Sequence, residues 1–272
     1  MSHPATAQPQ AIEAFNQLAE GYDDLFTKSL IGRAQRNAVW NVLRQTFQRG
    51  DHILELNCGT GEDALFLARN GISVFACDAS ERMIQVANKR LSEEGLNTGV
   101  YLRLLPTERL HELGSTATFD GAFSNFSGLN CVADLRQTAE DLASLLPAGT
   151  PLLICLSSRF CISEMVWFLL HGEFRKAFRR CSGHTTAKVG EFTVDVYYPT
   201  VWQLRKSLSP FFILQSVAGI GVTVPPSYVE TWIRKRPKLL HLLRAIDATV
   251  ATRPWFRVLG DHVLLRFERV QA

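Results

Sequence analysis

The sequence lacks several features that mark other classes of protein. It has no run of 18 or more apolar residues, so we expect no membrane-spanning helix. Residues 1–10 are polar and contain no apolar core of a secretion signal, so we expect a cytoplasmic protein. Lysine and arginine number 29 against 26 aspartates and glutamates, an excess too small to predict a nucleic-acid partner.

Signals for disulfides and metal ions are also missing. The six cysteines are dispersed and form no C-x-x-C pair, so we expect reduced, mostly buried thiols. No H-E-x-x-H motif or other close cluster of histidine, cysteine and carboxylate occurs, and the sequence therefore predicts no metal site.

The chain does contain a strand, a glycine loop, a helix and a second strand in close succession. Residues 53–56 form a short apolar run typical of a buried parallel strand, and Gly59 and Gly61 follow it. Residues 62–70 have the apolar stripe of a helix, whose N-terminus would direct free N–H groups at a ligand. Asp78 ends the second strand, where a carboxylate can accept hydrogen bonds from both hydroxyls of a ribose. This layout predicts a nucleoside-binding crevice.

Two kinds of nucleoside-binding protein share this layout. A dinucleotide oxidoreductase has G-x-G-x-x-G, and Ala64 in the third glycine position is permitted, so the spacing alone does not exclude NAD(P). Glu62 and Asp63 in the first helical turn would repel a pyrophosphate, which favours a ligand without phosphate. An NAD(P)-dependent oxidoreductase stays as an alternative.

The segment from Glu55 to Asp78 resembles motif I of the class I S-adenosylmethionine-dependent methyltransferases, E/D-x-G-x-G-x-G. The resemblance implies that Glu55 is the acidic position, that Gly59 and Gly61 are the later glycines and that Asp78 binds the ribose. Asn57 departs from the pattern, since the family usually has its first glycine there. The implied cofactor is S-adenosylmethionine. The implied fold is a three-layer α/β fold with a seven-stranded, mostly parallel sheet whose last strand is antiparallel.

Further positions follow the family pattern after that motif. Ala79 and Met83 come after the ribose acid, where the family packs residues against adenine, although Met83 also suits a plain core. In the family an acidic residue after the third strand meets the adenine amino group; Pro106 stands where an aspartate is common, so backbone groups with Thr107 or Glu108 would serve instead. Tyr22 lies in a segment similar to the family's A-x-x-Y-D, which folds over the cofactor; the alternative is a half-buried tyrosine in a turn.

The end of the fourth expected strand completes the predicted site. Asn125 and Phe126 follow this strand and should lie near the transferable methyl group; the alternative is a turn cap and a core residue. The residues expected to bind the cofactor are Tyr22, Glu55, Asn57, Gly59, Gly61, Asp78, Ala79, Met83, Thr107, Glu108, Asn125 and Phe126.

The chain is expected to have three parts. Residues 1–50 form an N-terminal helical lid, with Arg33, Arg36 and Arg44 on a solvated helix face; residues 51–160 form the cofactor-binding core; and residues 161–272 hold the other strands. Two insertions, about 160–198 and 222–260, are apolar and aromatic and are expected to form a helical cap. We expect a long helix from 162 to 180, a mobile polar loop over 181–186 and a strand over 191–198.

The composition of the insertions favours a small lipophilic or aromatic acceptor, with a homodimer interface as the alternative reading. The basic run at residues 234–238 suits either peripheral membrane contact or a solvated helix end. Oxygen is favoured slightly over carbon or nitrogen as the atom methylated. A catalytically inactive methyltransferase-fold subunit that binds a partner protein is a further alternative.

A hydroxyl acceptor needs a base to remove its proton. His184 and Tyr197 are the expected catalytic residues, and other candidates are His171, Tyr198 and Glu164. His262 beside Asp261 resembles a base and its orienting acid, but it opens the last strand and we expect it to be structural.

Overall fold

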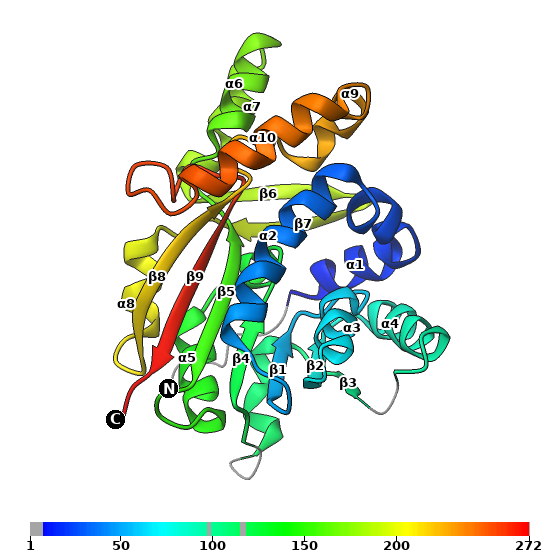
Figure 1. The fold of residues 1–272 in the computed structure, drawn as a ribbon, viewed down its shortest axis with the longest axis vertical. Helices are drawn as coiled ribbons and strands as arrows, with labels where there is room; N and C mark the ends of the chain where they lie inside the picture. Colours follow the sequence, from blue (N-terminus) through cyan, green and yellow to red (C-terminus); the bar gives the residue numbers. More distant parts are fainter. Residues whose placement is uncertain (1–7, 97–98, 115–117, 272) are drawn as a thin grey trace.

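The computed structural model describes residues 8–96, 99–114 and 118–271, and most of the polar N-terminal stretch lies outside these ranges (Figure 1). One seven-stranded sheet runs through the molecule in the order β3–β2–β1–β4–β5–β9–β8. Its strands are β1 His52–Leu56, β2 Ser73–Asp78, β3 Val100–Leu104, β4 Gly121–Ser124, β5 Pro151–Ser157, β8 Phe212–Ile220 and β9 His262–Arg269.

The strands of this sheet are parallel except for the last. The pairs β1–β2, β2–β3, β1–β4 and β4–β5 are parallel, whereas β9 runs antiparallel to both β5 and β8. This topology confirms the predicted seven-stranded, mostly parallel sheet with an antiparallel last strand.

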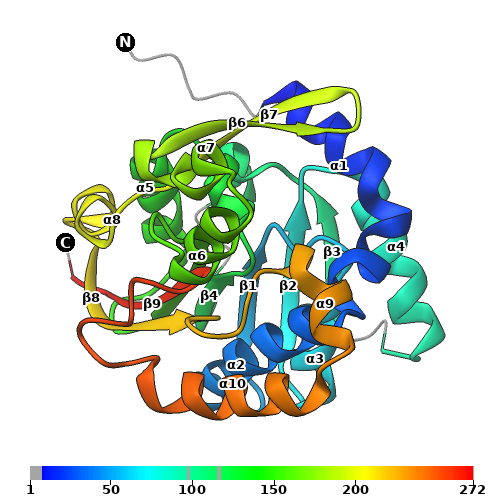
Figure 2. The same cartoon turned by 90° about the horizontal axis from the view of Figure 1, so that it is seen from above.

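Helices cover both faces of the sheet, as Figure 2 shows from above. The α-helices are α1 Pro9–Tyr22, α2 Leu30–Thr46, α3 Glu62–Arg69, α4 Glu81–Glu93, α5 Leu135–Leu145, α6 Ile162–Leu170, α7 Phe174–Ala177, α8 Val201–Leu208, α9 Glu230–Arg234 and α10 Pro237–Val250. The short helical turns are η1 Asp23–Thr27, η2 Thr107–Leu113, η3 Gly128–Cys131, η4 Arg179–Ser182 and η5 Ser227–Val229.

Two hydrophobic cores lie on the two faces of the sheet. Ile53 and Leu54 are neighbours in β1, yet Ile53 joins the core under α2 and α3 while Leu54 joins the core under α5 and α8. Successive side chains of a strand point to opposite faces, so a strand between two helical layers must be apolar on both sides. This explains the continuous apolar runs of the central strands.

The first insertion differs from the prediction. The expected long helix is wrong: α6 ends at Leu170, Gly172 has a left-handed φ of +73°, and α7 begins at Phe174. A glycine in this conformation ends a helix because it carries no Cβ that would clash. The expected mobile loop is also wrong, since His184–Val189 forms strand β6 of an antiparallel hairpin. Its partner β7, Phe192–Tyr197, confirms the predicted strand.

The second insertion is helical, as predicted. Helices α9 and α10 pack on α2 through a separate apolar cluster that includes Ile31, Val229 and Ile233. Figure 1 shows both insertions at one end of the sheet. Helix α1 lies at the same end, beside the β6–β7 hairpin of the first insertion. None of the helices in the described residues combines the length and apolar character needed to cross a bilayer.

Candidate active site

A cavity of about 260 Å³ lies where β1, β2 and β4 end, under α1 and the β6–β7 hairpin. Ten of the twelve residues expected to bind the cofactor line it; the other two are Glu55 and Gly61. The ten are Tyr22, Asn57, Gly59, Asp78, Ala79, Met83, Thr107, Glu108, Asn125 and Phe126. The carboxyl ends of parallel strands meet at one edge of the sheet, which brings these separate segments together.

The loop after β1 has a left-handed backbone at three positions. Asn57, Gly59 and Gly61 have φ values of +56°, +54° and +74°. Asparagine is among the few non-glycine residues that adopt this conformation readily, so Asn57 can replace the family's first glycine. Its side chain donates to Thr107 Oγ1 at 3.0 Å and accepts from Ser124 Oγ at 3.2 Å, which ties the loop to η2 and β4.

Gly61 shapes the loop from below the cavity. It is the N-cap of α3, and a Cβ at this position would lie 2.9 Å from the Cβ of Ala87 in α4. Glycine is therefore needed here for close packing of the loop on α4 as well as for the turn.

Asp78 stands at the end of β2 with both oxygens engaged by the backbone. Oδ2 accepts from the Gly59 N–H and Oδ1 from the Ser80 N–H, each at 2.8 Å. Burial raises the pKa of this carboxyl, while the hydrogen bonds from Ser80 and Gly59 act to lower it. A carboxylate has about four acceptor positions, so two remain available to a ribose.

Glu55 lies beneath the loop and does not reach the cavity. It is 1% exposed, and its Oε2 has no hydrogen-bond partner. Burial, with the nearby charge of Asp63, raises the pKa of the Glu55 carboxyl well above its ordinary value, so it favours the protonated form.

The cavity contains an arginine that the sequence analysis placed on a solvated face. Arg36 is 6% exposed, and its Nη1 donates to Asp63 Oδ2 at 2.5 Å. Asp63 also accepts from Trp40 and Asn125, which holds the pair in place. The expectation for Arg36 was wrong because the buried stripe of α2 also includes Val39, three positions on. The spacing from Val39 suits a buried position, but the partner that buries Arg36, Asp63 of α3, lies far away along the chain.

His184 and Tyr197 lie on the outer face of the hairpin. They are paired opposite each other, and His184 Nε2 contacts Asp195 Oδ1 at 3.0 Å. The alternate residues of the two strands face inward and line the cavity; they are Ala187, Val189, Val194 and Val196. The period-two alternation of a strand therefore directs both side chains away from the cavity.

A second cavity of about 240 Å³ adjoins the first, and the two share Tyr22, Phe126 and Ser127. Phe126 and Ser127 have left-handed φ values of +46° and +71°, a conformation that is uncommon for such residues and clusters at functional sites. The other residues that line the second cavity are Phe26, Ser157, Arg179, Arg180, Pro226, Ser227, Tyr228, Asp261 and His262.

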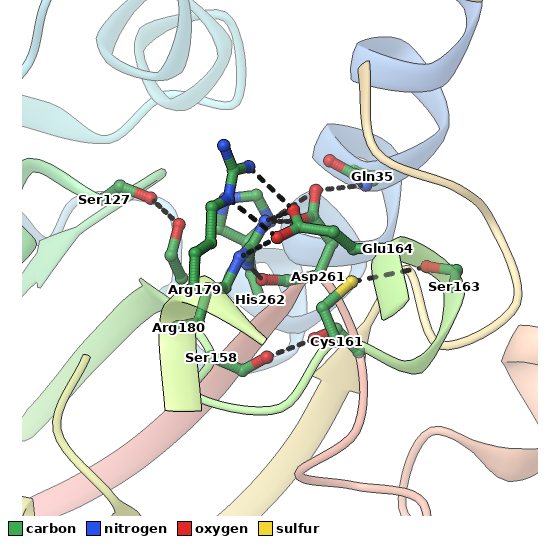
Figure 3. A network of polar contacts seen from close by, with 12 residues as sticks. Gln35, Ser127, Ser158, Cys161, Ser163, Glu164, Arg179, Arg180, Asp261 and His262 are labelled. Atoms are coloured by element: carbon green, nitrogen blue, oxygen red, sulfur yellow. Dashed lines mark hydrogen bonds and ion pairs between the residues drawn. The ribbon is translucent and has the colours of Figure 1, made fainter. Parts of the chain in front are cut away.

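A polar network surrounds the second cavity (Figure 3). Arg180 donates to Glu164 and to Asp261, and Arg179 donates to Glu164 with both Nε and Nη2 at 3.0 Å. Gln35 of α2 donates to Asp261 Oδ2 at 3.1 Å. Two guanidinium groups thus face two carboxylates, and their charges balance.

Comparison with known families and structures identifies the domain. Residues 53–149 match the sequence model of the family described as methyltransferase domain. Residues 53–149 therefore contain a methyltransferase domain, and the seven-stranded sheet has the class I methyltransferase fold. The chain resembles DhpI in its S-adenosylhomocysteine complex at a TM-score of 0.60, over 100% of both chains, with 14% identity. At that identity the likeness concerns the fold.

Curated relatives carry similar names. A demethylmenaquinone methyltransferase of Symbiobacterium thermophilum is 28% identical over 169 residues, which are 61% of this chain and 65% of that protein. A ubiquinone biosynthesis O-methyltransferase of Parvibaculum lavamentivorans is 33% identical over 106 residues, 39% of this chain and 40% of that protein. The chain thus spans less than two thirds of the length of these relatives.

The first cavity fits S-adenosylmethionine, the cofactor that the resemblance to the family implies, on three counts. Arg36 Nε is buried without a partner and can donate to the amino-acid carboxylate. Gly59 leaves room for close backbone approach, with no atom within 4 Å of a Cβ built there. Asp78 keeps acceptor capacity for the ribose. The described residues contain no group of three or more side chains suited to hold a metal ion.

Proposed function

We propose that the chain is an S-adenosylmethionine-dependent methyltransferase that acts on a small, lipophilic or aromatic molecule, with oxygen favoured over carbon and nitrogen as the atom methylated. The observation that carries the proposal is the pair of adjoining cavities that meet at Tyr22, Phe126 and Ser127. A cofactor in the first cavity and an acceptor in the second would meet across these three residues.

The lining of the cofactor cavity supports a reaction that excludes water. Ile12 and Phe15 of α1 close one side, and Val194 and Val196 of the hairpin close another. S-adenosylmethionine supplies a methyl group on a positively charged sulfur, already activated for displacement. The chain has to align the acceptor with that carbon and keep water out, and such positioning contributes much of the rate in reactions of this kind.

The names of the two curated relatives support a quinone-like acceptor, a lipophilic ring compound. All six cysteines are free, as expected in a reducing compartment, and we include a cytoplasmic location in the proposal.

The proposal is tested by incubating the protein with methyl-labelled S-adenosylmethionine and a lipid extract of its source cells. One compound of the extract should gain the label and about 14 mass units, because a methyl group replaces a hydrogen. Cofactor binding by calorimetry without transfer of label would instead support an inactive subunit. A shift in NAD(P)H fluorescence without binding of S-adenosylmethionine would support an oxidoreductase.

A further inference from the structure

The second cavity holds a titratable side chain that the binding of the cofactor does not use. His262 is 7% exposed, and the edge of its ring meets the Phe126 ring with centroids 5.2 Å apart. Its Nδ1 lies 3.5 Å from Asp261 Oδ2 and has no hydrogen-bond partner. His262 lines the second cavity, and we assign Nε2, the ring nitrogen remote from that carboxylate, as the atom available to a molecule bound there.

Burial leaves His262 neutral at neutral pH. Burial lowers the pKa of His262, and Arg180 acts in the same direction, against the opposing effect of Asp261. The Asp261 carboxylate is itself held by Arg180 and Gln35. A neutral imidazole beside an ionised carboxylate is the arrangement in which a histidine can accept a proton.

The other titratable groups around this cavity are poorly suited to accept a proton. Burial raises the pKa of both Tyr22 and Tyr228, so these phenols stay protonated at neutral pH. Glu164 accepts hydrogen bonds from both Arg179 and Arg180 and is 1% exposed. Although burial acts to raise it, the pKa of Asp261 is lowered by the charge of Arg180 and by hydrogen bonds from Arg180 and Gln35, which makes Asp261 a weak base.

We propose that the second cavity binds the methyl acceptor, a molecule with an aromatic or enolic hydroxyl, and that Nε2 of His262 accepts its proton. This inference rests on the proposed function and names the substrate class of the same site. As the hydroxyl proton passes to Nε2, an electron pair of the acceptor forms the bond to the methyl carbon. The pair of the broken carbon–sulfur bond stays on sulfur, which becomes a neutral thioether. Asp261 then faces the imidazolium and stabilises its charge.

The test compares wild type, His262→Gln and the control His241→Gln, whose histidine is exposed on α10. The acceptor probe is 1,4-dihydroxynaphthalene, and single-turnover methylation is measured from about pH 5 to pH 10. In wild type the rate should rise with pH and level off once His262 is neutral, below its ordinary pKa of about 6.5. In His262→Gln the rate at neutral pH should fall about 100-fold or more, and it should keep rising toward the pKa of the probe. His241→Gln should follow wild type.

Calorimetry with S-adenosylhomocysteine separates this inference from the proposed function. Unchanged binding of this cofactor product to His262→Gln, with the altered pH profile, supports the inference. A wild-type pH profile in His262→Gln overturns it, and so does loss of cofactor binding together with activity, which would make His262 structural. Failure of wild type to methylate the probe while it binds S-adenosylhomocysteine overturns the hydroxyl acceptor. If wild type does not bind S-adenosylhomocysteine at all, the proposed function itself is refuted.

A second inference comes from an independent feature, the surface of the first insertion. Large apolar side chains are exposed along α6, α7 and the residue after α7, with Leu170 at 80% and Phe174 at 66%. We call this set the apolar face; it comprises Ile162, Val166, Leu169, Leu170, Phe174 and Phe178. Ile162, Val166 and Leu169 are four and three positions apart, so they form one stripe of the helix. A stripe of this kind on a surface marks an interaction site.

Positive charge is concentrated around the same surface. Residues 159–183 and 222–250 together contain ten basic and four acidic residues. The rest of the chain contains 19 basic and 22 acidic residues, so the excess of positive charge lies in these two segments. These two segments are neighbours, because Trp167 of α6 meets Trp232 of α9 with ring centroids 6.0 Å apart. Arg236 lies over the Trp232 ring at 4.1 Å. Exposed apolar and aromatic side chains among cations are typical of proteins that lie on anionic bilayers.

The second cavity lies against the same helix as the apolar face, on its other side. Phe168 of α6 stacks on Tyr228 at 5.4 Å between centroids, and Arg179 lies over the same Phe168 ring at 5.6 Å. Tyr228 and Arg179 both line the second cavity. Docking of the apolar face on a bilayer would therefore place the second cavity one helix away from the lipid.

We infer that the apolar face docks on the surface of an anionic lipid bilayer. The test is sedimentation with vesicles of phosphatidylcholine containing phosphatidylglycerol, and with vesicles of phosphatidylcholine alone. Wild type should sediment with the anionic vesicles and lose binding as salt is raised. Leu170→Glu/Phe174→Glu should weaken binding at least tenfold, and Arg175→Gln/Lys176→Gln by about tenfold or more, since each cation near the surface contributes.

Matched controls use exposed side chains away from this face. Trp202→Glu on α8 removes an apolar side chain that is 67% exposed, and Arg82→Gln/Lys89→Gln on α4 removes two cations; neither should change vesicle binding. Unchanged binding of S-adenosylhomocysteine shows that each variant is folded. The inference is overturned if wild type does not bind the anionic vesicles at low salt, or if the face variants bind as wild type does. It is also overturned if wild type is a dimer that Leu170→Glu/Phe174→Glu dissociates, because the face would then join two copies.

Discussion

Nη1 of Arg36 lies 2.5 Å from Oδ2 of Asp63 in the cofactor cavity, while Nε of the same guanidinium is buried without a partner. The ion pair fixes the position of the guanidinium and leaves the Nε–H as a buried donor for a ligand. A guanidinium matches a carboxylate in geometry and charge, and the amino-acid end of the cofactor carries a carboxylate.

Replacing Arg36 with lysine should weaken binding of S-adenosylhomocysteine about tenfold, or about 1.4 kcal/mol. The lysine keeps the charge beside Asp63 but cannot supply the Nε donor. The measurement is calorimetry with S-adenosylhomocysteine and with 5′-methylthioadenosine, which lacks the amino-acid carboxylate. The affinity for methylthioadenosine should stay the same; an equal loss for both ligands would contradict the assignment.

Replacing Asp78 with alanine should weaken cofactor binding by roughly 2–4 kcal/mol, because charge-assisted hydrogen bonds to the ribose are lost. The control is Asp120→Ala, since Asp120 also accepts from a backbone N–H, that of His52, but lies just before β4 at the opposite edge of the sheet. Calorimetry should show cofactor affinity lowered in the first variant and kept in the second. Equal affinity in both variants would place the ribose elsewhere.

Alanine at Gly61 should destabilise the protein more than alanine at Gly59. Both positions have positive φ, which costs about 1–2 kcal/mol for a residue with a Cβ. Only at Gly61 would that Cβ also clash, with Ala87 at 2.9 Å. Urea unfolding of the two variants measures the difference. Equal loss of stability would show that α4 yields to the added methyl group.

Replacing Glu55 with glutamine should raise the free energy of unfolding relative to wild type, and the difference should grow as the pH rises. Because burial raises the pKa of Glu55 well above its ordinary value, the folded protein holds a proton there that the unfolded chain releases. The unfolding free energy therefore falls as pH increases from the unfolded pKa of about 4.5 toward the folded one. Urea unfolding at about pH 4 should show similar stability for both proteins, and at about pH 8 greater stability for Glu55→Gln. A pH-independent difference between them would refute the protonated state.

Glutamine at His184 and phenylalanine at Tyr197 should leave methyl transfer unchanged within about twofold, because both side chains lie on the outer face of the hairpin, away from both cavities. Label transfer to the lipid extract measures this. A loss of more than about tenfold at constant cofactor affinity would show that the hairpin rearranges when the acceptor binds.

Much of the cofactor site was predictable because its signals are local in the sequence. The apolar strand, Gly59, Gly61 and Asp78 follow one another within residues 53–78, and each has a direct conformational meaning. The one departure, Asn57, keeps the left-handed backbone that a glycine would adopt. The antiparallel direction of the last strand followed from resemblance to the family and is confirmed by the pairing of β9 with β5 and β8.

The position of the remaining groups depends on contacts between distant segments. Arg36 seemed a surface residue by charge, yet it is buried because Asp63 and Phe126 from other elements pack against it. His184 seemed to belong to a loop, whereas pairing with Tyr197 makes it part of a strand and turns it outward.

By itself, therefore, the sequence determined the glycine loop after β1, because backbone conformation and apolar periodicity are encoded within short segments, and its resemblance to the family implied the class of fold. Only the tertiary structure decided that Arg36 enters the cofactor cavity and that His262 borders a second cavity. The reason is physical: the direction of a side chain from a helix or strand is set by which face of that element finds an apolar partner, and that partner lies far away along the chain.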